Sequence, residues 1–227
     1  SKTIVSNHGF ASLGSQLSHQ SAWKKSVCEV YKDAEVPLDW TEDLFRTCKE
    51  AKIDFFTTPY NFECIDEVDK FVPAYKIGSG DITHHDLIVD ICEKNKPVMI
   101  ATGASELNEV SEVVDLIRKR HNPLVLMQCN TNYTASLENF RFINLSVLKT
   151  YGLLFPDVIL GLSDHTPGHS TVLGAIALGA KVIEKHFTND NDLVGPDHKF
   201  SMDPKSWREM VERSRELEVA LGSPAKK

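Results

Sequence analysis

The sequence predicts an α/β fold of the (β/α)8 barrel type, with about six β/α units present. From residue 40 onward, short apolar segments alternate with segments of helical period. The apolar segments are apolar almost throughout, which is typical of a parallel sheet covered by helices. Polar residues follow each apolar segment, as they do at the carboxyl ends of barrel strands. No G-x-G-x-x-G follows the first segment, which disfavours a dinucleotide-binding fold.

Six segments are predicted to be strands. Each is short, rich in apolar or β-branched residues, and followed by small or polar residues. In chain order they are 53–59 (IDFFTTP), 74–80 (AYKIGSG), 97–103 (PVMIATG), 124–130 (LVLMQCN), 157–165 (DVILGLSDH) and 180–187 (AKVIEKHF).

Two of the intervening helices carry clear start signals. Ser105 is a suitable N-cap for a helix whose apolar face begins at Leu107. Asp203 followed by Pro204 is typical of an N-cap and first helical residue, and predicts the last helix. Residues 1–39 show turn signals and no clear strand–helix pair, so we expect an irregular or helical segment there. Residues 40–227 are then the barrel domain, which we expect to be incomplete at its N-terminal side.

Composition narrows the class of protein. The net charge of −7 argues against nucleic acid as a partner, because phosphate contacts need a basic surface. No apolar run is long enough to cross a membrane. The five cysteines include no C-x-x-C pair, which favours a reducing cytoplasm over a disulfide framework or a structural zinc site.

Two consecutive predicted strands end in a histidine, His165 and His186. Neighbouring strands lie about 4.8 Å apart, so the two imidazoles can reach one divalent ion and leave its other positions to water or substrate. The alternative is that each histidine caps its strand through a backbone hydrogen bond.

A lysine and small residues end the second predicted strand. Burying the charge of Lys76 inside a barrel costs free energy unless an anion neutralises it. The small residues that follow Lys76 let backbone N–H groups approach a phosphate. Lys76 and Ser79 therefore predict a phosphate or carboxylate site. The alternative is that Lys76 pairs with an internal carboxylate such as Glu184.

Five segments occur in the order PAYKIGSGD, ATGAS, GLSDHT, ALGAKVIEKHFT and GPDHKFSMDP. Together they resemble the sialic acid (N-acetylneuraminate) synthase family, from about residue 40 to the end. The combination of GLSDHT, EKHFT and GPDxxxSM is specific, although each piece alone is modest. The resemblance implies a barrel enzyme that condenses phosphoenolpyruvate with an N-acylated amino sugar such as N-acetylmannosamine. A nonulosonic acid and phosphate are the implied products, and Mn²⁺ or Mg²⁺ is the implied cofactor.

The resemblance also implies roles for single residues. His165 and His186 would bind the metal ion, and Asp81 and Lys76 would be catalytic. Asp81 stands where many members have glutamate, so its reach is shorter. The implied substrate contacts are Thr58, Lys76, Ser79, Thr131, Tyr133, Ser163 and Asp197.

Three features of the family do not occur in this sequence. These are an opening E-I-G-x-N-H strand, a K-F-Q strand, and the antifreeze-like domain that brings an arginine into a partner's site. The resemblance therefore implies the last six units of a synthase barrel that is a homodimer in its full-length form. Two alternatives stay open: a related synthase with a different acceptor sugar, and a truncated remnant that binds a ligand without turnover.

Overall fold

A computed structural model describes residues 25–131, 136–193, 195, 197–223 and 225. The chain forms two compact units, Ser1–Tyr75 and Lys76–Lys227, and the boundary between them falls within strand β1. The domain boundary predicted at residue 40 stays a prediction. Within the described ranges, every helix is too short or too polar to span a bilayer.

The described part of the first unit is helical. Ser26 begins its first helix with a capping box, in which the serine side chain and Glu29 satisfy each other's backbone N–H groups. The Phe45 and Phe71 rings pack with centroids 5.5 Å apart. The helices of this unit are α2 (Val27–Asp33), the 3-10 helix η2 (Leu38–Trp40), α3 (Thr41–Glu50) and α4 (Phe62–Asp69).

The first predicted strand, residues 53–59, is not a strand in the structure. Its large apolar side chains Ile53 and Phe56 are 61% and 45% exposed. A strand needs ladder hydrogen bonds and a packed face, and apolar composition alone supplies neither. The prediction of six strands is therefore wrong, because the described residues form five.

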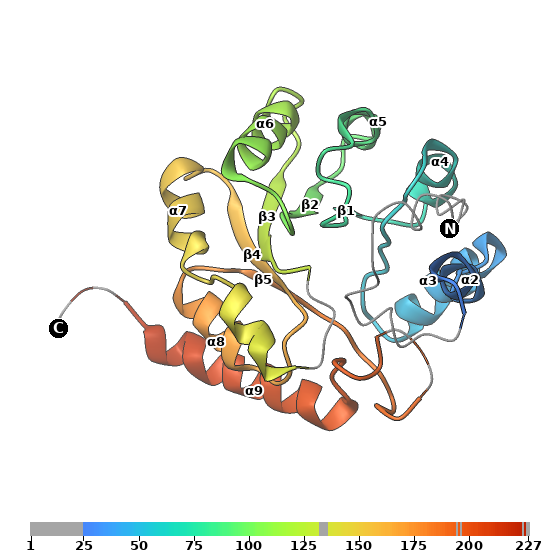
Figure 1. The fold of residues 1–227 in the computed structure, drawn as a ribbon. Coiled ribbons are helices and arrows are strands. Elements are labelled where there is room, and N and C mark those ends of the chain that lie inside the picture. Colours follow the sequence, from blue (N-terminus) through green and yellow to red (C-terminus); the bar gives the residue numbers. More distant parts are fainter. Residues whose placement is uncertain (1–24, 132–135, 194, 196, 224, 226–227) are drawn as a thin grey trace. The chain divides into compact units, whose positions relative to one another are not determined.

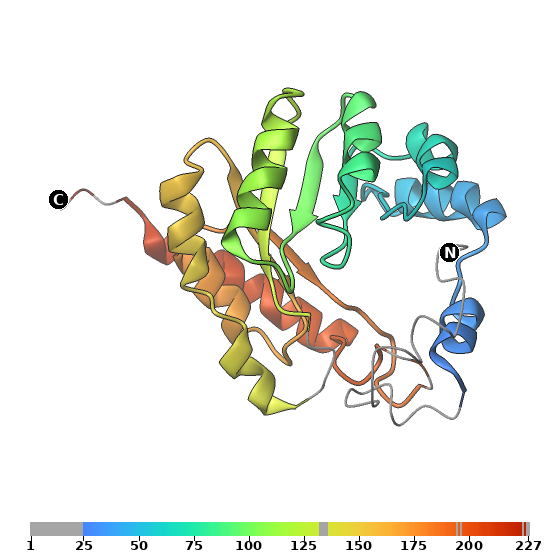
Figure 2. The same ribbon diagram turned by 45° about the horizontal axis from the view of Figure 1, so that its top comes forward.

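The second unit is built on one curled sheet with strand order β1-β2-β3-β4-β5 (Figure 1). Successive pairs from β2 to β5 are parallel. Helices α6 and α7 pack against β3, α7 and α8 pack against β4, and α9 packs along α8 (Figure 2). This α/β arrangement is part of a barrel, and the described residues do not close it. The elements are β1 (Tyr75–Ile77), α5 (His85–Glu93), β2 (Val98–Ala101), α6 (Leu107–Arg118), β3 (Leu124–Cys129), the 3-10 helix η3 (Leu137–Phe142), α7 (Val147–Leu154), β4 (Ile159–Asp164), α8 (Ser170–Ala177), β5 (Val182–Lys185) and α9 (Pro204–Leu221).

Alternation along the strands divides the side chains between two faces. Cys129, Ser163 and Glu184 are register partners across β3, β4 and β5, so they form one row on one face. Leu162 points to the opposite face, where it packs with Val172 of α8 in an apolar cluster. The site residues therefore lie on the face away from the helices.

The two predicted helix caps have different outcomes. The Asp203 side chain caps α9, which begins at Pro204, so that prediction is confirmed. Helix α6 is capped by Glu106 and not by Ser105. The reason is a capping box: the backbone N–H of Glu106 donates to the Glu109 carboxylate at 2.7 Å, and this fixes Glu106 as the N-cap.

Candidate active site

Lys76, Ser163 and Glu184 meet at the ends of β1, β4 and β5. The Lys76 ammonium donates a hydrogen bond to Glu184 Oε1 at 2.7 Å, and the Ser163 hydroxyl donates to the same oxygen at 3.3 Å. The Lys76 and Glu184 side chains are 13% and 33% exposed, so solvent reaches this ion pair. The alternative interpretation of Lys76 is what the structure shows: an internal carboxylate neutralises it.

Cys129 belongs to the same cluster. Its side chain packs with Ala101 and Met127. Its thiol also lies against the hydroxyls of Ser163 and Ser79, and burial raises its pKa, so it is protonated at neutral pH. Its place in the cluster follows from strand pairing, because Cys129 is the register partner of Ser163.

Ser79 is held against the turn that follows β2. A Cβ atom added to Gly103 would lie 2.4 Å from Ser79 Cβ, which is too close for any side chain. Gly103 also has a φ of +43°, which favours glycine. Two strand-end turns therefore touch at this point, and the contact places the Ser79 hydroxyl beside Cys129.

Asp81 is half-buried just after the β1 turn, where its backbone N–H donates to the carbonyl of Gly78 at 3.0 Å. Burial raises the pKa of its carboxyl, and electrostatic interactions with His84 and Lys76 act in the opposite direction. Asp81 therefore keeps its proton to a higher pH than an exposed aspartate, a property suited to proton transfer.

The two predicted metal ligands lie side by side. The rings of His165 and His186 have centroids 5.0 Å apart. His165 Nδ1 donates to the backbone carbonyl of Asn130 at 2.7 Å. Burial lowers the pKa of His165 to about 4, so this imidazole is neutral at physiological pH. Phe200 packs edge-on against both rings, with centroid distances of 5.9 and 4.9 Å.

This arrangement fits a divalent ion held by two imidazoles. Neutral imidazole is the form that binds metals, and a hydrogen bond from one ring nitrogen to a carbonyl orients a ligating histidine and leaves the lone pair on the other nitrogen. Within the described ranges, no three histidine, cysteine or acidic side chains converge on a metal position. Two protein ligands would leave the remaining positions to water or substrate, as catalytic sites do.

Asp197, which the resemblance implies as a sugar contact, lies beside the histidine pair. Its Oδ2 is 3.4 Å from His186 Nδ1. The carboxylate is therefore placed to orient the His186 ring, and its contact with sugar stays a prediction.

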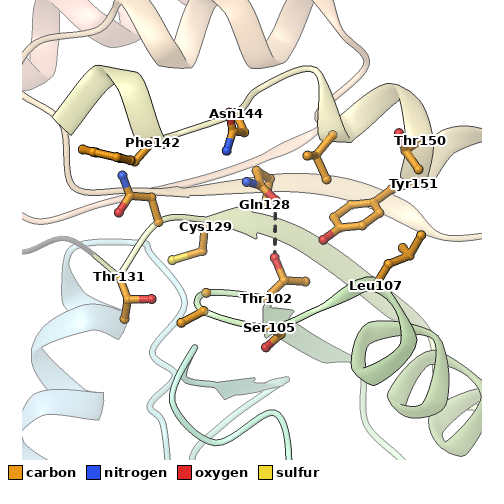
Figure 3. Close-up of a pocket in the computed structure, with 14 residues that line it drawn as sticks. Thr102, Ser105, Leu107, Gln128, Cys129, Thr131, Phe142, Asn144, Thr150 and Tyr151 are labelled. Carbon is orange, nitrogen blue, oxygen red and sulfur yellow. Dashed lines mark hydrogen bonds between the residues drawn. The ribbon is translucent and has the colours of Figure 1, made fainter. Parts of the chain in front are cut away.

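Thr131 follows β3 and lines a cavity of about 590 Å³ with Thr102, Gln128 and Tyr151 (Figure 3). Among the described residues, the buried Thr131 hydroxyl oxygen has no hydrogen-bond partner. The Thr102 hydroxyl donates a long hydrogen bond to Gln128 Oε1, with 3.5 Å between the two oxygens. None of the described residues that line this cavity is charged, so it is suited to neutral hydroxyl or amide groups and not to the anion.

For two further predicted contacts, the structure gives no position relative to this cluster. Tyr133 falls outside the described residues. Thr58 is half-buried in the first unit, and the cluster described above belongs to the second. Their roles stay predictions.

The chain is similar to known proteins along nearly its whole length. The model of the NeuB family matches residues 2–226. An uncharacterised protein of Methanocaldococcus jannaschii is 36% identical over 205 residues, which cover 89% of this chain and 60% of that protein. A pseudaminic acid synthase of Campylobacter jejuni is 32% identical over 201 residues, covering 88% of this chain and 57% of the synthase.

A solved structure shows the same fold. The N-acetylneuraminic acid synthetase of Leptospira borgpetersenii, crystallised with citrate, superposes with a TM-score of 0.82 at 27% identity. The match covers 88% of this chain and 69% of the synthetase. The chain thus spans about three fifths of the length of the curated relatives it matches.

Proposed function

Because the chain belongs to the NeuB family, we propose that it carries the strand-end site of a synthase that joins phosphoenolpyruvate to an N-acylated amino sugar. The products would be a nonulosonic acid and phosphate. One observation carries the proposal. A lysine–hydroxyl cluster suited to an anion, formed by Lys76 of β1 with residues of β4 and β5, occurs together with a pair of adjacent histidines that follow β4 and β5. Such a site can bring two reactants together in one orientation.

Lys76 is the proposed anion ligand. Phosphoenolpyruvate would replace Glu184 as its partner, and the hydroxyls of Ser79 and Ser163 would donate hydrogen bonds to the bound anion. The Lys76–Glu184 pair is partly exposed, so water can solvate Glu184 when the substrate takes its place. The protonated thiol of Cys129 adds a weak donor to the same cluster.

His165 and His186 would hold a divalent ion, Mn²⁺ or Mg²⁺, which supplies Lewis-acid polarisation of a carbonyl oxygen when it is bound. Asn130 and Asp197 orient the two rings. Phe200 packs against both rings and helps to fix their position.

The bond changes balance as follows. C3 of phosphoenolpyruvate forms a bond to the aldehyde carbon of the open-chain sugar, and water adds at C2. The bond between C2 and the phosphate oxygen then breaks and phosphate leaves. The developing alkoxide takes a proton from Asp81, the proposed donor, because its raised pKa keeps the carboxyl protonated to higher pH. One proton of the added water returns to the Asp81 carboxylate, and the other leaves with phosphate as the C2 carbonyl forms. Lys76 holds the phosphate group throughout.

We propose an N-acetylmannosamine-like sugar as the acceptor. A related N-acylated amino sugar is the alternative, because the two named relatives make different products, pseudaminic acid and N-acetylneuraminic acid. A homodimer and a cytoplasmic location stay predictions.

Binding and turnover are tested separately. Phosphoenolpyruvate binding is measured by calorimetry on the chain, on Lys76→Met, and on the matched control Lys149→Met, which removes an exposed lysine on α7. We expect Lys76→Met to weaken binding at least tenfold and Lys149→Met to leave it unchanged. Equal binding by all three proteins would exclude Lys76 as the anion ligand.

Turnover is measured as phosphate release and keto-acid formation with N-acetylmannosamine and Mn²⁺, against reactions without sugar and with EDTA. We expect both products only when sugar and metal are present, and neither from His186→Ala. Phosphoenolpyruvate binding without turnover on any N-acylated hexosamine would assign the chain a binding role. Absence of both would refute the proposal.

A further inference from the structure

A second lysine–carboxylate pair links β4 and β5 on the face that the helices cover. Asp164 and Lys185 are register partners, and Lys185 Nζ donates to Asp164 Oδ2 at 2.9 Å. Their side chains are 0% and 2% exposed. Because charges are costly to bury, such a pair is retained only when its geometry and its other hydrogen bonds are good.

The hydrogen-bonding capacity of this pair is used within the protein. The Asp164 carboxylate accepts hydrogen bonds from the backbone N–H and hydroxyl of Thr166 and from the hydroxyl of Thr171 on α8. Lys185 Nζ also donates to the carbonyls of Thr166 and Gly168. All three ammonium protons thus have acceptors, and the pair is sealed from solvent. It is not placed to bind a substrate.

Its position is what points to a role. Asp164 directly precedes His165, and Lys185 directly precedes His186. Strand alternation puts the ion pair on the opposite face from Ser163 and Glu184, one residue before the two imidazoles. The pair therefore joins β4 to β5 directly beneath the histidines, and Thr171 ties it to helix α8.

Stability alone does not explain such a pair. Replacing a buried ion pair by apolar residues of similar size is often neutral or stabilising. An apolar contact, however, tolerates sliding and rotation, whereas a cross-strand ion pair with six further hydrogen bonds on its two charged groups sets one separation of the strand ends.

We propose that Asp164 and Lys185 are positioning residues that fix the distance and orientation between His165 and His186, so that both imidazoles bind the same divalent ion. The inference rests on the metal site of the proposed function. It assigns the ion pair a role in metal affinity that is separate from folding.

Co²⁺ is the probe, because it binds imidazole more tightly than Mn²⁺ and shifts the ring N–H proton of each coordinated histidine far from its usual NMR position. The variants are Asp164→Asn/Lys185→Met and the baseline His165→Ala/His186→Ala. We expect the wild-type chain to show two shifted N–H signals that the baseline lacks. We expect Asp164→Asn/Lys185→Met to remain folded by circular dichroism, to bind Co²⁺ at least tenfold more weakly, and to lose one of the two signals.

If the double variant does not fold, a milder variant tests the positioning role. Thr171→Val removes one donor to Asp164 and keeps the ion pair, and should weaken Co²⁺ binding about threefold. The positioning role would be overturned if a folded variant bound Co²⁺ with wild-type affinity and showed both shifted N–H signals. The proposed metal site would not be affected by that result. Wild-type Co²⁺ binding no better than the histidine-free baseline would instead refute the metal site itself.

Discussion

The two lysine–carboxylate pairs of this sheet have nearly the same length, 2.7 Å for Lys76–Glu184 and 2.9 Å for Lys185–Asp164, yet their surroundings differ. The first pair shares a single carboxylate oxygen with Ser163 and is open to solvent. The second is sealed and has all its ammonium protons bonded. Glu184 and Lys185 are consecutive residues, so alternation alone sends them to opposite faces. Exposure and hydrogen-bond saturation then decide which pair can exchange partners.

The largest expected effect is the loss of folding stability when the sealed Lys185–Asp164 pair is broken. Lys185→Met leaves the Asp164 carboxylate buried without its counter-charge and should lower the free energy of unfolding by about 3–5 kcal/mol. The measurement is urea denaturation followed by circular dichroism. Asp164→Asn/Lys185→Met is the matched control and should lose clearly less, because no buried charge is left alone. A single variant as stable as the wild type would mean that water reaches Asp164.

The open pair should respond in binding and much less in stability. Lys76→Met leaves Glu184 with solvent and the Ser163 hydroxyl, so unfolding should change by only about 1–2 kcal/mol. Phosphoenolpyruvate affinity should nevertheless fall at least tenfold. Denaturation and calorimetry on the same protein separate the two effects. A loss of stability as large as that of Lys185→Met would remove the distinction between the pairs.

The contact between the two strand-end turns can be tested at Gly103. Alanine there has an unfavourable φ of +43° and places its Cβ 2.4 Å from Ser79 Cβ. We expect a destabilisation of about 2 kcal/mol, together with weaker phosphoenolpyruvate binding because Ser79 must move. Gly80→Ala is the control, since a Cβ at Gly80 meets nothing within 4 Å. Equal behaviour of the two variants would show that Ser79 is not held by this contact.

The smallest expected effect is an increase in phosphoenolpyruvate affinity. Glu184→Gln keeps the shape of the side chain and removes the charge that competes with substrate for Lys76. Phosphoenolpyruvate should therefore bind about two- to fivefold more tightly at pH 7, measured by calorimetry. Weaker binding would show instead that Glu184 holds Lys76 in its binding position and does not compete with the anion.

Local signals in the sequence identified much of the fold and of the candidate site. All five strands of the described residues lie fully inside predicted strand segments, and the Asp203–Pro204 start of α9 is confirmed. The adjacency of His165 and His186 also followed from the sequence, because consecutive parallel strands place their carboxyl ends together. Each of these inferences depends on residues within one strand or one helical turn.

Tertiary structure decided what depends on residues far apart in the chain. Whether Lys76 meets an anion or Glu184, 108 residues away, is a matter of burial and distance, and no local pattern encodes it. The place of Cys129 in the row with Ser163 required the register of β3 with β4. Residues 53–59 look like a strand locally, but a strand exists only where a neighbour completes its hydrogen bonds and covers its face. Local sequence thus set the type and ends of most elements, whereas pairing across the sheet set which charged groups are sealed and which are open to a ligand.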